Sequence, residues 1–355
     1  MTRRVWPLLT LACALLAASA HPARGETIAL TAELDPSSPT VRSGAPAIVL
    51  LKLTSSSTGL LEGSLEARIA EMGTVVSMTD LVLSTGAQRI KLNLPPLNLA
   101  NYQHEVPLEL RFHTKSANLT LGTVNLRVPT AQQRNLTIAV CDPWKGADAR
   151  VENSLVQGLR FEQFNPSSER NPLTTVAAYL RPEELPQDPL GWCSFDCALL
   201  VDQGLIEVRE KQLEALREWI EAGGAACIAP GTQGDAVHTA FLNSLFDRTD
   251  GPFVLDPSGK LSTDGIASNG LVLRKFGLGR VALLVGESNW GERPDVVRHA
   301  AAALWRFRAV QFNASLATGK WDPAHATQLS QQAAQQMHQR YPPDPNQIDV
   351  SLHDA

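Results

Sequence analysis

The sequence predicts an α+β protein of two domains, an antiparallel β-sandwich followed by a doubly wound α/β domain. Two observations support this prediction. Between residues 26 and 130, short runs rich in Val, Leu, Ile and Thr are separated by turn residues, with no helical pattern. Beyond residue 135, apolar runs of strand length alternate with helical stretches. That alternation is typical of a parallel sheet with helices on both faces.

Residues 1–20 have the features of a secretory signal peptide. Arg3 and Arg4 precede an apolar stretch from Val5 to Ala18, and small residues follow at 18–20. We expect cleavage after Ala20, with a site near Gly25 as the alternative. The mature chain is then exported, to a bacterial periplasm or outside the cell. No later run is long enough to predict a membrane span.

The sandwich is predicted from seven short strands within residues 26–130. They are Thr27–Leu34, Ala47–Thr54, Gly63–Ala70, Thr74–Leu83, Gln88–Leu94, Glu105–His113 and Leu119–Val128. This spacing is typical of an immunoglobulin-like architecture, although the Cys…Trp…Cys pattern is absent. We expect such a domain to act as a spacer or an adhesive module. His104 and His113 have no ligand partner nearby in sequence, so we assign them to the surface or an edge.

A βαβ unit between Phe195 and Gly234 is the clearest feature of the second domain. The apolar run Phe195–Val201 predicts a strand buried on both faces. A helix follows at about 207–222, with Leu213, Leu216 and Ile220 on one stripe and a Gly-Gly stop after it. The run Ala225–Ala229 is the second strand. This order predicts a right-handed crossover and a parallel sheet.

The remaining elements complete a flavodoxin-like domain over residues 135–312. Strands are predicted at 136–140, 160–164, 271–276 and 280–285. Helices are predicted at 153–159, 172–179, 236–246 and 295–307, and a hairpin or excursion at 249–268. The tail 313–355 is polar and rich in Gln and Ala. We expect it to be disordered or to dock on something else.

Charge and cysteine content narrow the classes of function. The net charge of −5 and the lack of a Lys/Arg block argue against nucleic acid as a partner. After cleavage the cysteines are Cys141, Cys193, Cys197 and Cys227. Three of them lie in or beside predicted buried strands, which favours buried thiols over disulfides. Cys193 and Cys197 lack further ligands at zinc spacing, so we expect neither a metal nor a cofactor.

Three stretches around the βαβ unit carry a family resemblance. They are Phe195-Asp196-Cys197, Trp219-Ile220-Glu221-Ala222-Gly223-Gly224 and Cys227-Ile228-Ala229-Pro230-Gly231. Together they resemble the class I glutamine amidotransferase-like domain. More specifically, the segment is similar to the divergent copies found in exported or membrane-anchored bacterial proteins. The segment Leu273–Val285 resembles the hairpin that such copies carry before their last helix. The resemblance covers about residues 136–312 and implies the fold rather than the activity.

The residues that the amidotransferase reaction needs are missing. The resemblance places the nucleophile turn at Ala229–Gln233, which contains no cysteine. Cys227 lies within the predicted strand, and Thr232 has no precedent as the nucleophile in this family. Glu287-Ser288-Asn289-Trp290 occupies the region of the family's His-x-Glu pair. We therefore expect no glutamine hydrolysis.

Several polar and aromatic residues are predicted near the carboxyl ends of the strands, where ligands bind in open α/β sheets. They are Asp142, Trp144, Asp202, Thr232, Glu287, Ser288 and Trp290. One interpretation is a rebuilt carboxylate site with catalytic candidates Asp142, Asp202, Glu287 and Ser288, and with Thr232, Trp144 and Trp290 contacting a ligand. The other is ordinary loop and cap chemistry. We assign His238 and His299, on predicted helices, to the surface.

These observations leave three functional hypotheses. The first is a non-enzymatic binding or assembly protein of the bacterial cell envelope, with an envelope protein as partner. The second is a hydrolase or ligand-binding enzyme with the rebuilt carboxylate site. The third is a sugar-binding module that stacks its ligand on Trp144, Trp192 and Trp290, which requires at least two exposed indole faces.

Overall fold

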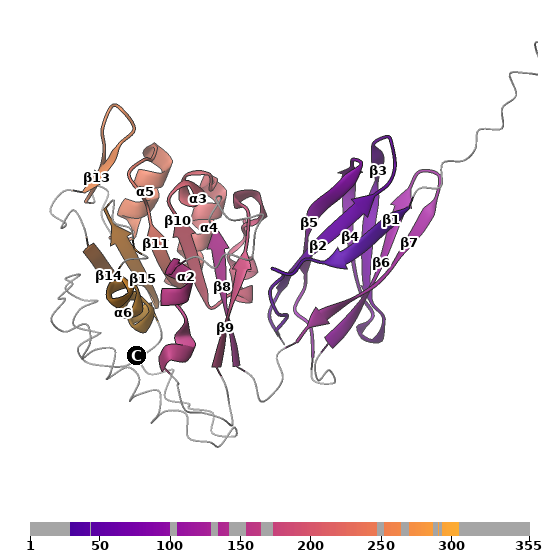
Figure 1. Cartoon of the computed structure of the whole chain (residues 1–355), viewed down its shortest axis with the longest axis horizontal. Helices are drawn as coiled ribbons and strands as arrows, with labels where there is room; N and C mark the ends of the chain where they lie inside the picture. Colours follow the sequence, from indigo (N-terminus) through magenta and orange to yellow (C-terminus); the bar gives the residue numbers. More distant parts are fainter. Residues whose placement is uncertain are drawn as a thin grey trace, which may run out of the picture.

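The computed structural model describes residues 29–42, 44–99, 105–128, 134–141, 154–164, 173–246, 252–263, 270–286, 290 and 293–304. The predicted signal peptide and the polar tail lie outside these ranges. The described chain is a mixed α+β protein with two parts (Figure 1). We call residues 29–128 the sandwich and residues 134–304 the C-terminal domain.

The sandwich is built from two antiparallel sheets. One has the strand order β1-β2-β5, formed by Leu30–Leu34, Ala47–Ser55 and Gly86–Leu94. The other has the order β4-β3-β6-β7, formed by Thr74–Leu83, Leu61–Ile69, Glu105–Thr114 and Asn118–Arg127. Inward residues such as Val49, Leu65 and Phe112 fill the core between the sheets. The predicted antiparallel strands are confirmed, with small shifts of their bounds.

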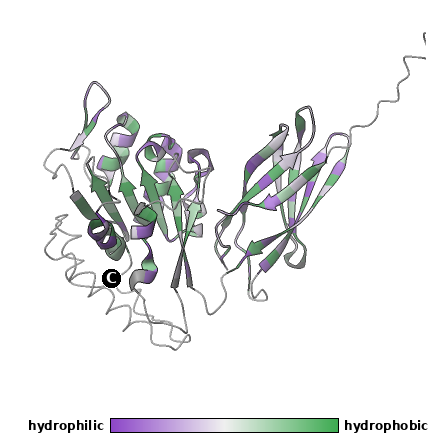
Figure 2. Cartoon of the chain, in the orientation of Figure 1, coloured by the Kyte–Doolittle hydropathy of each residue, from purple (hydrophilic) through white to green (hydrophobic). Residues whose placement is uncertain are grey.

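The C-terminal domain contains a six-stranded sheet with the order β14-β15-β11-β10-β8-β9. The strands are Gly270–Phe276 (β14), Gly279–Val285 (β15), Ala225–Ala229 (β11), Cys197–Val201 (β10), Arg134–Cys141 (β8) and Leu173–Tyr179 (β9). All neighbouring pairs are parallel except β14 with β15. Figure 2 shows these strands as mainly hydrophobic, as expected for a sheet covered on both faces.

Helices cover both faces of this sheet. On one face, α2 (Ser154–Gly158) and α6 (Pro294–Leu304) pack over residues such as Ile138 and Leu284. On the other, α4 (Glu210–Glu221) and α5 (Ala236–Ser244) pack over Ala198 and Leu283. The short α3 (Gln203–Ile206) follows β10. The predicted stripe of α4 is confirmed, because Leu213, Leu216 and Ile220 are all buried.

Two predicted elements were wrong. Residues 172–179 were expected to be helical but form β9, whose backbone pairs in parallel with β8 along its whole length. Residues 160–164 were expected to be a strand but form a 3₁₀ turn, η2 (Phe161–Phe164). The backbone N–H of Phe161 donates to Thr175 Oγ1 of β9 at 2.8 Å. The position at the sheet edge is taken by β9, and η2 packs beside it, so tertiary pairing overrides the local pattern.

The polar segment predicted as a hairpin or excursion contains a hairpin. Strands β12 (Phe253–Leu255) and β13 (Leu261–Thr263) pair antiparallel. The buried amide of Asn243 on α5 bonds both backbone groups of Phe253, at 2.9 Å each, and so fixes the hairpin to the domain. The hairpin also pairs with the loop after β11, through Leu261 N to Thr232 O at 2.8 Å.

Candidate functional site

The candidate site lies at the carboxyl ends of β10 and β11. In the sheet order β9-β8-β10-β11, the chain passes from β8 to its neighbour β9 on one side. It then returns to β10, which lies on the other side of β8. The switch point of the sheet therefore lies between β8 and β10, and such points form ligand crevices in open α/β sheets. Asp202 follows β10 directly at this place. Among the predicted candidates, its position is the one that the sheet topology favours.

Asp202 has an unusual backbone, with φ 43° and ψ −115° between β10 and α3. Residues other than glycine seldom adopt positive φ, and such strain is a pointer to function. The conformation is held by the hydrogen bond from Asp202 N to Ala229 O of β11, at 2.7 Å. The carbonyl of Asp202 accepts the first bonds of α3 from Leu205 N and Ile206 N. Its exposed carboxylate does not cap that helix.

Gly231 lies beside Asp202 on the turn that follows β11. Its φ of +68° is in the region that favours glycine. A Cβ at this position would overlap Oδ1 of Asp202 and lie 2.9 Å from its Cγ. The carboxylate therefore fills the space in which a side chain at position 231 would begin. The sequence alone did not reveal this contact, because the two residues belong to different strand ends.

Thr232, the next residue, is half-buried between β11 and the hairpin β12–β13. Its carbonyl accepts from Leu261 N, and Gly234 N donates to Gly259 O at 3.1 Å. The loop is thus fixed by the hairpin on one side and lies against the carboxylate of Asp202 on the other. Thr232 and Asp202 come from neighbouring strands, so the structure places these two predicted candidates at the same edge of the sheet.

Other predicted site residues lie outside the described residues. They are Asp142, Trp144, Glu287 and Ser288. The strands that precede Asp142 and Glu287 are described, and they show where each of these two residues follows the sheet. Cys141 ends β8 opposite Leu200 of β10, so Asp142 follows a strand adjacent to that of Asp202. Glu287 follows Gly286 and β15, which is separated from β10 by β11.

The cysteines do not supply a nucleophile at this edge. Cys141, Cys197 and Cys227 are buried, as expected, whereas Cys193 is exposed. Cys227 lies in the middle of β11, where burial raises its pKa to about 12. Burial also raises the pKa of Cys197 well above its ordinary value, with a smaller contribution from Cys227. Both groups are neutral thiols at neutral pH.

The two predicted surface histidines of this domain are buried, which corrects the sequence-based prediction. His238 is 4% exposed and His299 is 1% exposed. The ring of His238 lies between Asp235 Oδ1, 2.7 Å from Nδ1, and the carbonyl of Val208, 3.0 Å from Nε2. Both partners of the ring are hydrogen-bond acceptors. The helical spacing around His238 could not reveal its contact with Val208, because Val208 lies 30 positions away, between α3 and α4.

The sugar-stacking hypothesis lacks support from the described tryptophans. Trp192 is fully buried and stacks on Trp219, with ring centroids 5.6 Å apart. Trp290 is 7% exposed and packs under α6, with the guanidinium of Arg293 5.3 Å from its ring centroid. Neither offers an open indole face for a sugar ring. Trp144 lies outside the described residues.

Within the described ranges, no group of three or more His, Cys, Asp or Glu side chains could hold a metal ion. None of the helices in the same ranges is both long and apolar enough to cross a bilayer. His113 lies on the sandwich sheet, 3.5 Å from Glu66 Oε2 and 2.9 Å from Asn118 Oδ1. His104 lies outside the described residues.

No family model matches the chain, and no curated protein matches it. Among solved structures, a CARDB domain from Pyrococcus furiosus is 12% identical and covers 29% of this chain and 88% of its own, with a TM-score of 0.21. The alkylpurine DNA glycosylase AlkC of Pseudomonas fluorescens is 12% identical over 28% of this chain and 30% of its own, with a TM-score of 0.19. A GH20 exo-β-N-acetylglucosaminidase from Vibrio harveyi is 7% identical over 78% of this chain and 36% of its own, with a TM-score of 0.17. Similarities this low carry no conclusion about fold or function.

Proposed function

We propose that the protein is an exported, non-enzymatic binding or assembly protein of the bacterial cell envelope. In this proposal the C-terminal domain is a degenerate, flavodoxin-like relative of the class I glutamine amidotransferase-like domain, and the sandwich is immunoglobulin-like. The strand order, the βαβ unit around α4 and the late β14–β15 hairpin support the relationship. The partner is an envelope protein.

One observation supports the loss of the hydrolytic activity above the others. The turn after β11 is where the family resemblance places the nucleophile, and its positive-φ position is Gly231. The Asp202 carboxylate occupies the space that a nucleophilic side chain would need there. Cys227, the nearest thiol in sequence, is buried and protonated. Amidotransferase chemistry needs an exposed, activated nucleophile at this turn.

The loss of activity is tested with the purified mature chain and a diazoketone analogue of glutamine, which alkylates the nucleophile of active glutaminases. An active glutaminase in the same reaction serves as the positive control. We expect intact-mass analysis to show no adduct on this chain, and no ammonia release from glutamine. Stoichiometric labelling of Thr232 or of any cysteine would overturn the proposal.

The assembly role is tested by affinity capture from envelope extracts, with three forms of the mature chain. These are the full chain, a chain that ends at Phe312, and the full-length Asp202→Asn variant. We expect a partner that binds the full chain and the variant equally and is lost from the shortened chain. Absence of any partner with the full chain would contradict the assembly role.

A second candidate function follows from the backbone of Asp202. A strained residue on a sharp strand-to-helix turn is the arrangement that presents a nucleophile in other α/β enzymes, and carboxylates serve as nucleophiles in several enzyme classes. Asp202 occupies such a turn, with its carboxylate exposed. This favours a hydrolase or ligand-binding enzyme with a carboxylate site at the sheet edge.

This alternative is tested by a ligand screen that follows thermal stability in three proteins. These are the wild type, Asp202→Asn, and Glu207→Gln as a control for the loss of a nearby exposed carboxylate. A ligand that stabilises the wild type and the control but not Asp202→Asn supports a site at Asp202. Equal stabilisation of all three proteins excludes Asp202 from ligand binding.

A further inference from the structure

The connection from β9 to β10 lacks the helix that the sheet topology leads one to expect. Both β9→β10 and β10→β11 cross the sheet in the same direction, so right-handed crossovers place both connections on the same face. The second connection contains α4. The first, residues 180–196, is fully described and holds only two 3₁₀ turns, η3 (Pro182–Glu184) and η4 (Pro189–Ser194). These turns are shorter than a covering helix.

The outer face of the sandwich sheet β1-β2-β5 covers the remaining area. In β2, residues 47–51 are buried without interruption, whereas Lys52 and Thr54 further along are exposed. Val49 and Leu51 point into the sandwich core. Ile48 and Leu50 therefore point outward, and they belong to the core cluster of the C-terminal domain, with Trp192, Leu185 and Ala198.

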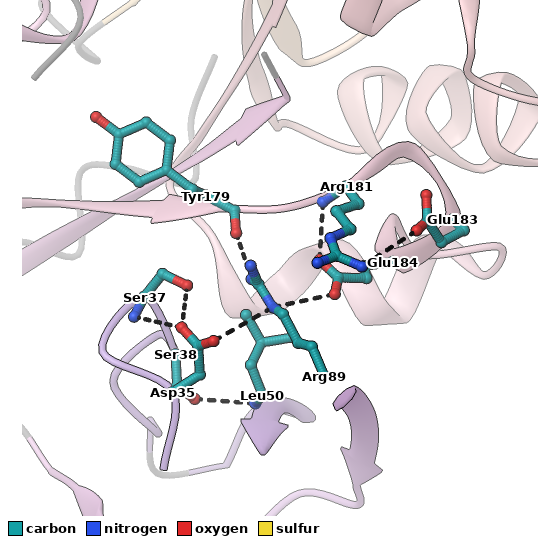
Figure 3. A network of polar contacts seen from close by, with 9 residues as sticks. All are labelled: Asp35, Ser37, Ser38, Leu50, Arg89, Tyr179, Arg181, Glu183 and Glu184. Atoms are coloured by element: carbon teal, nitrogen blue, oxygen red, sulfur yellow. Dashed lines mark hydrogen bonds and ion pairs between the residues drawn. The ribbon is translucent and has the colours of Figure 1, made fainter. Parts of the chain in front are cut away.

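Polar contacts from the sandwich surround this apolar patch. The side chain of Arg89 on β5 is 8% exposed, and its Nε lies 3.0 Å from Glu184 Oε1 and 3.6 Å from Asp35 Oδ2 (Figure 3). The same guanidinium donates to the carbonyl of Tyr179 at the end of β9. Lys91 Nζ donates to Leu185 O at 3.3 Å.

A second group of contacts lies at the opposite ends of the strands. The guanidinium of Arg42 pairs with the carboxylate of Asp196, which also accepts from Thr137 N at 2.7 Å. Ser194 Oγ on η4 donates to Pro46 O at 2.8 Å. The sandwich is therefore bound at both ends of the β8–β10 region, with apolar residues between.

We propose that the β1-β2-β5 sheet of the sandwich serves as the missing covering layer of the C-terminal domain, so that the two fold and unfold as one unit. In this proposal the patch formed by Trp192, Leu185 and Ala198 is an interaction surface whose partner is the outer face of β2. The sandwich is then an integral layer, not a spacer or an independent adhesive module. The inference stands independently of the proposed function.

The tryptophan distribution provides a direct test in the full chain. None of the seven tryptophans lies between residues 29 and 128, so tryptophan fluorescence does not report on the sandwich itself. The test variant is Leu50→Asp, which places a charge in the proposed contact. The matched control is Val82→Asp, at a sandwich residue that is 49% exposed. We expect Leu50→Asp to lower the tryptophan-monitored melting midpoint by at least about 5 °C, and Val82→Asp to leave it unchanged.

A second measurement does not depend on a substitution in the core. A protease site is placed in the linker between Val128 and Arg134 of the full chain, and the folded protein is cut there. We expect the two fragments to elute together on gel filtration and to melt in one transition. Fragments that separate while both remain folded would overturn the proposal. An unchanged tryptophan midpoint in Leu50→Asp would overturn it as well.

Discussion

Asp202 has a backbone conformation that is costly for any residue with a Cβ. The price of such strain is about 1–3 kcal/mol, and glycine avoids it at an entropic cost of about 0.5–1 kcal/mol. We expect Asp202→Gly to be more stable than Asp202→Ala by about 1–2 kcal/mol, since both lose the carboxylate and only alanine keeps the strain. Urea denaturation measures the difference. Equal stability of the two variants would show that the turn stores no strain.

The pair Asp235–His238 makes the start of α5 sensitive to acid. Burial raises the pKa of Asp235, but hydrogen bonds from the backbone and ring of His238 lower it by more, so the net pKa is below the usual 3.8. A carboxyl with a lowered folded pKa stabilises the fold above its unfolded pKa, and this contribution is lost as the pH falls through the folded value.

We therefore expect the wild type to lose stability more steeply below pH 3.8 than Asp235→Asn, which keeps a capping side chain but no charge. The measurement is the free energy of unfolding by urea at several pH values between 2 and 5. Glu218→Gln, at an exposed position of α4, is the control and should follow the wild type. The same acid slope in Asp235→Asn would contradict this account.

At the scale of elements, the tip of the β14–β15 hairpin closes the end of α4. Leu278 N donates to Glu221 O at 2.8 Å, and Arg280 N donates to Gly224 O at 3.1 Å. Carbonyls at a helix end need such donors. The close approach requires Gly279, where a Cβ would overlap the carbonyl oxygen of Ile220. The hairpin thus completes the βαβ unit that is evident in the sequence.

We expect Gly279→Ala to destabilise the protein by about 2 kcal/mol or more, because backbone atoms cannot move aside without breaking these bonds. Gly234→Ala is the matched control, since its added Cβ would meet its nearest atom at an ordinary 3.8 Å. The measurement is urea denaturation of both variants. A loss in Gly279→Ala no greater than in the control would contradict the proposed close contact.

Element prediction succeeded where the pattern is local. The sandwich strands and the βαβ unit follow from periodicities of two and 3.6, which the chain shows over a few residues. The error at residues 172–179 has a different origin. A run of this length fits either a short helix or a strand, and pairing with β8 decides between them. The uninterrupted apolar run Ala47–Leu51 also indicates a strand that is covered on both faces. A strand covered on one face should alternate between apolar and polar residues.

At the scale of the whole molecule, the contact between the two parts contains buried charges. Burial raises the pKa of Glu184, although Arg181 and Arg89 oppose the shift. Burial also lowers the pKa of Lys91, and Glu184 opposes that shift. Burial thus outweighs the nearby opposite charges in setting the direction of both pKa shifts.

We expect Glu184→Gln to change the pH dependence of stability in a defined direction. A carboxyl whose folded pKa is raised favours folding below its unfolded pKa of 4.5, and this contribution is lost as the pH rises through the folded value. The variant should therefore lose less stability than the wild type as the pH rises above 4.5. Urea denaturation between pH 4 and 7 tests this, with Glu218→Gln, at an exposed position of α4, as control. Identical pH profiles would contradict the expectation.

The candidate site was predictable only in part. Asp202 and Thr232 could be named because parallel strands end at the same edge of a sheet. The contact between Asp202 and Gly231 could not, since it depends on the backbone angles of two turns that follow different strands. The burial of His238 was missed for a similar reason, because its acceptor Val208 precedes α4 and is 30 positions away.

The sequence by itself determined the two-part organisation, the antiparallel strands of the first part and the parallel crossover of the second, because hydrophobic periodicity and turn residues act over short distances. Only the tertiary structure decided that β9 is a strand, that Asp202 fills the space beside Gly231, and that Ile48 and Leu50 belong to the core of the other domain. These features depend on register and on the contact between two surfaces. Residues far apart in the chain determine both, and no local pattern specifies which surfaces will meet.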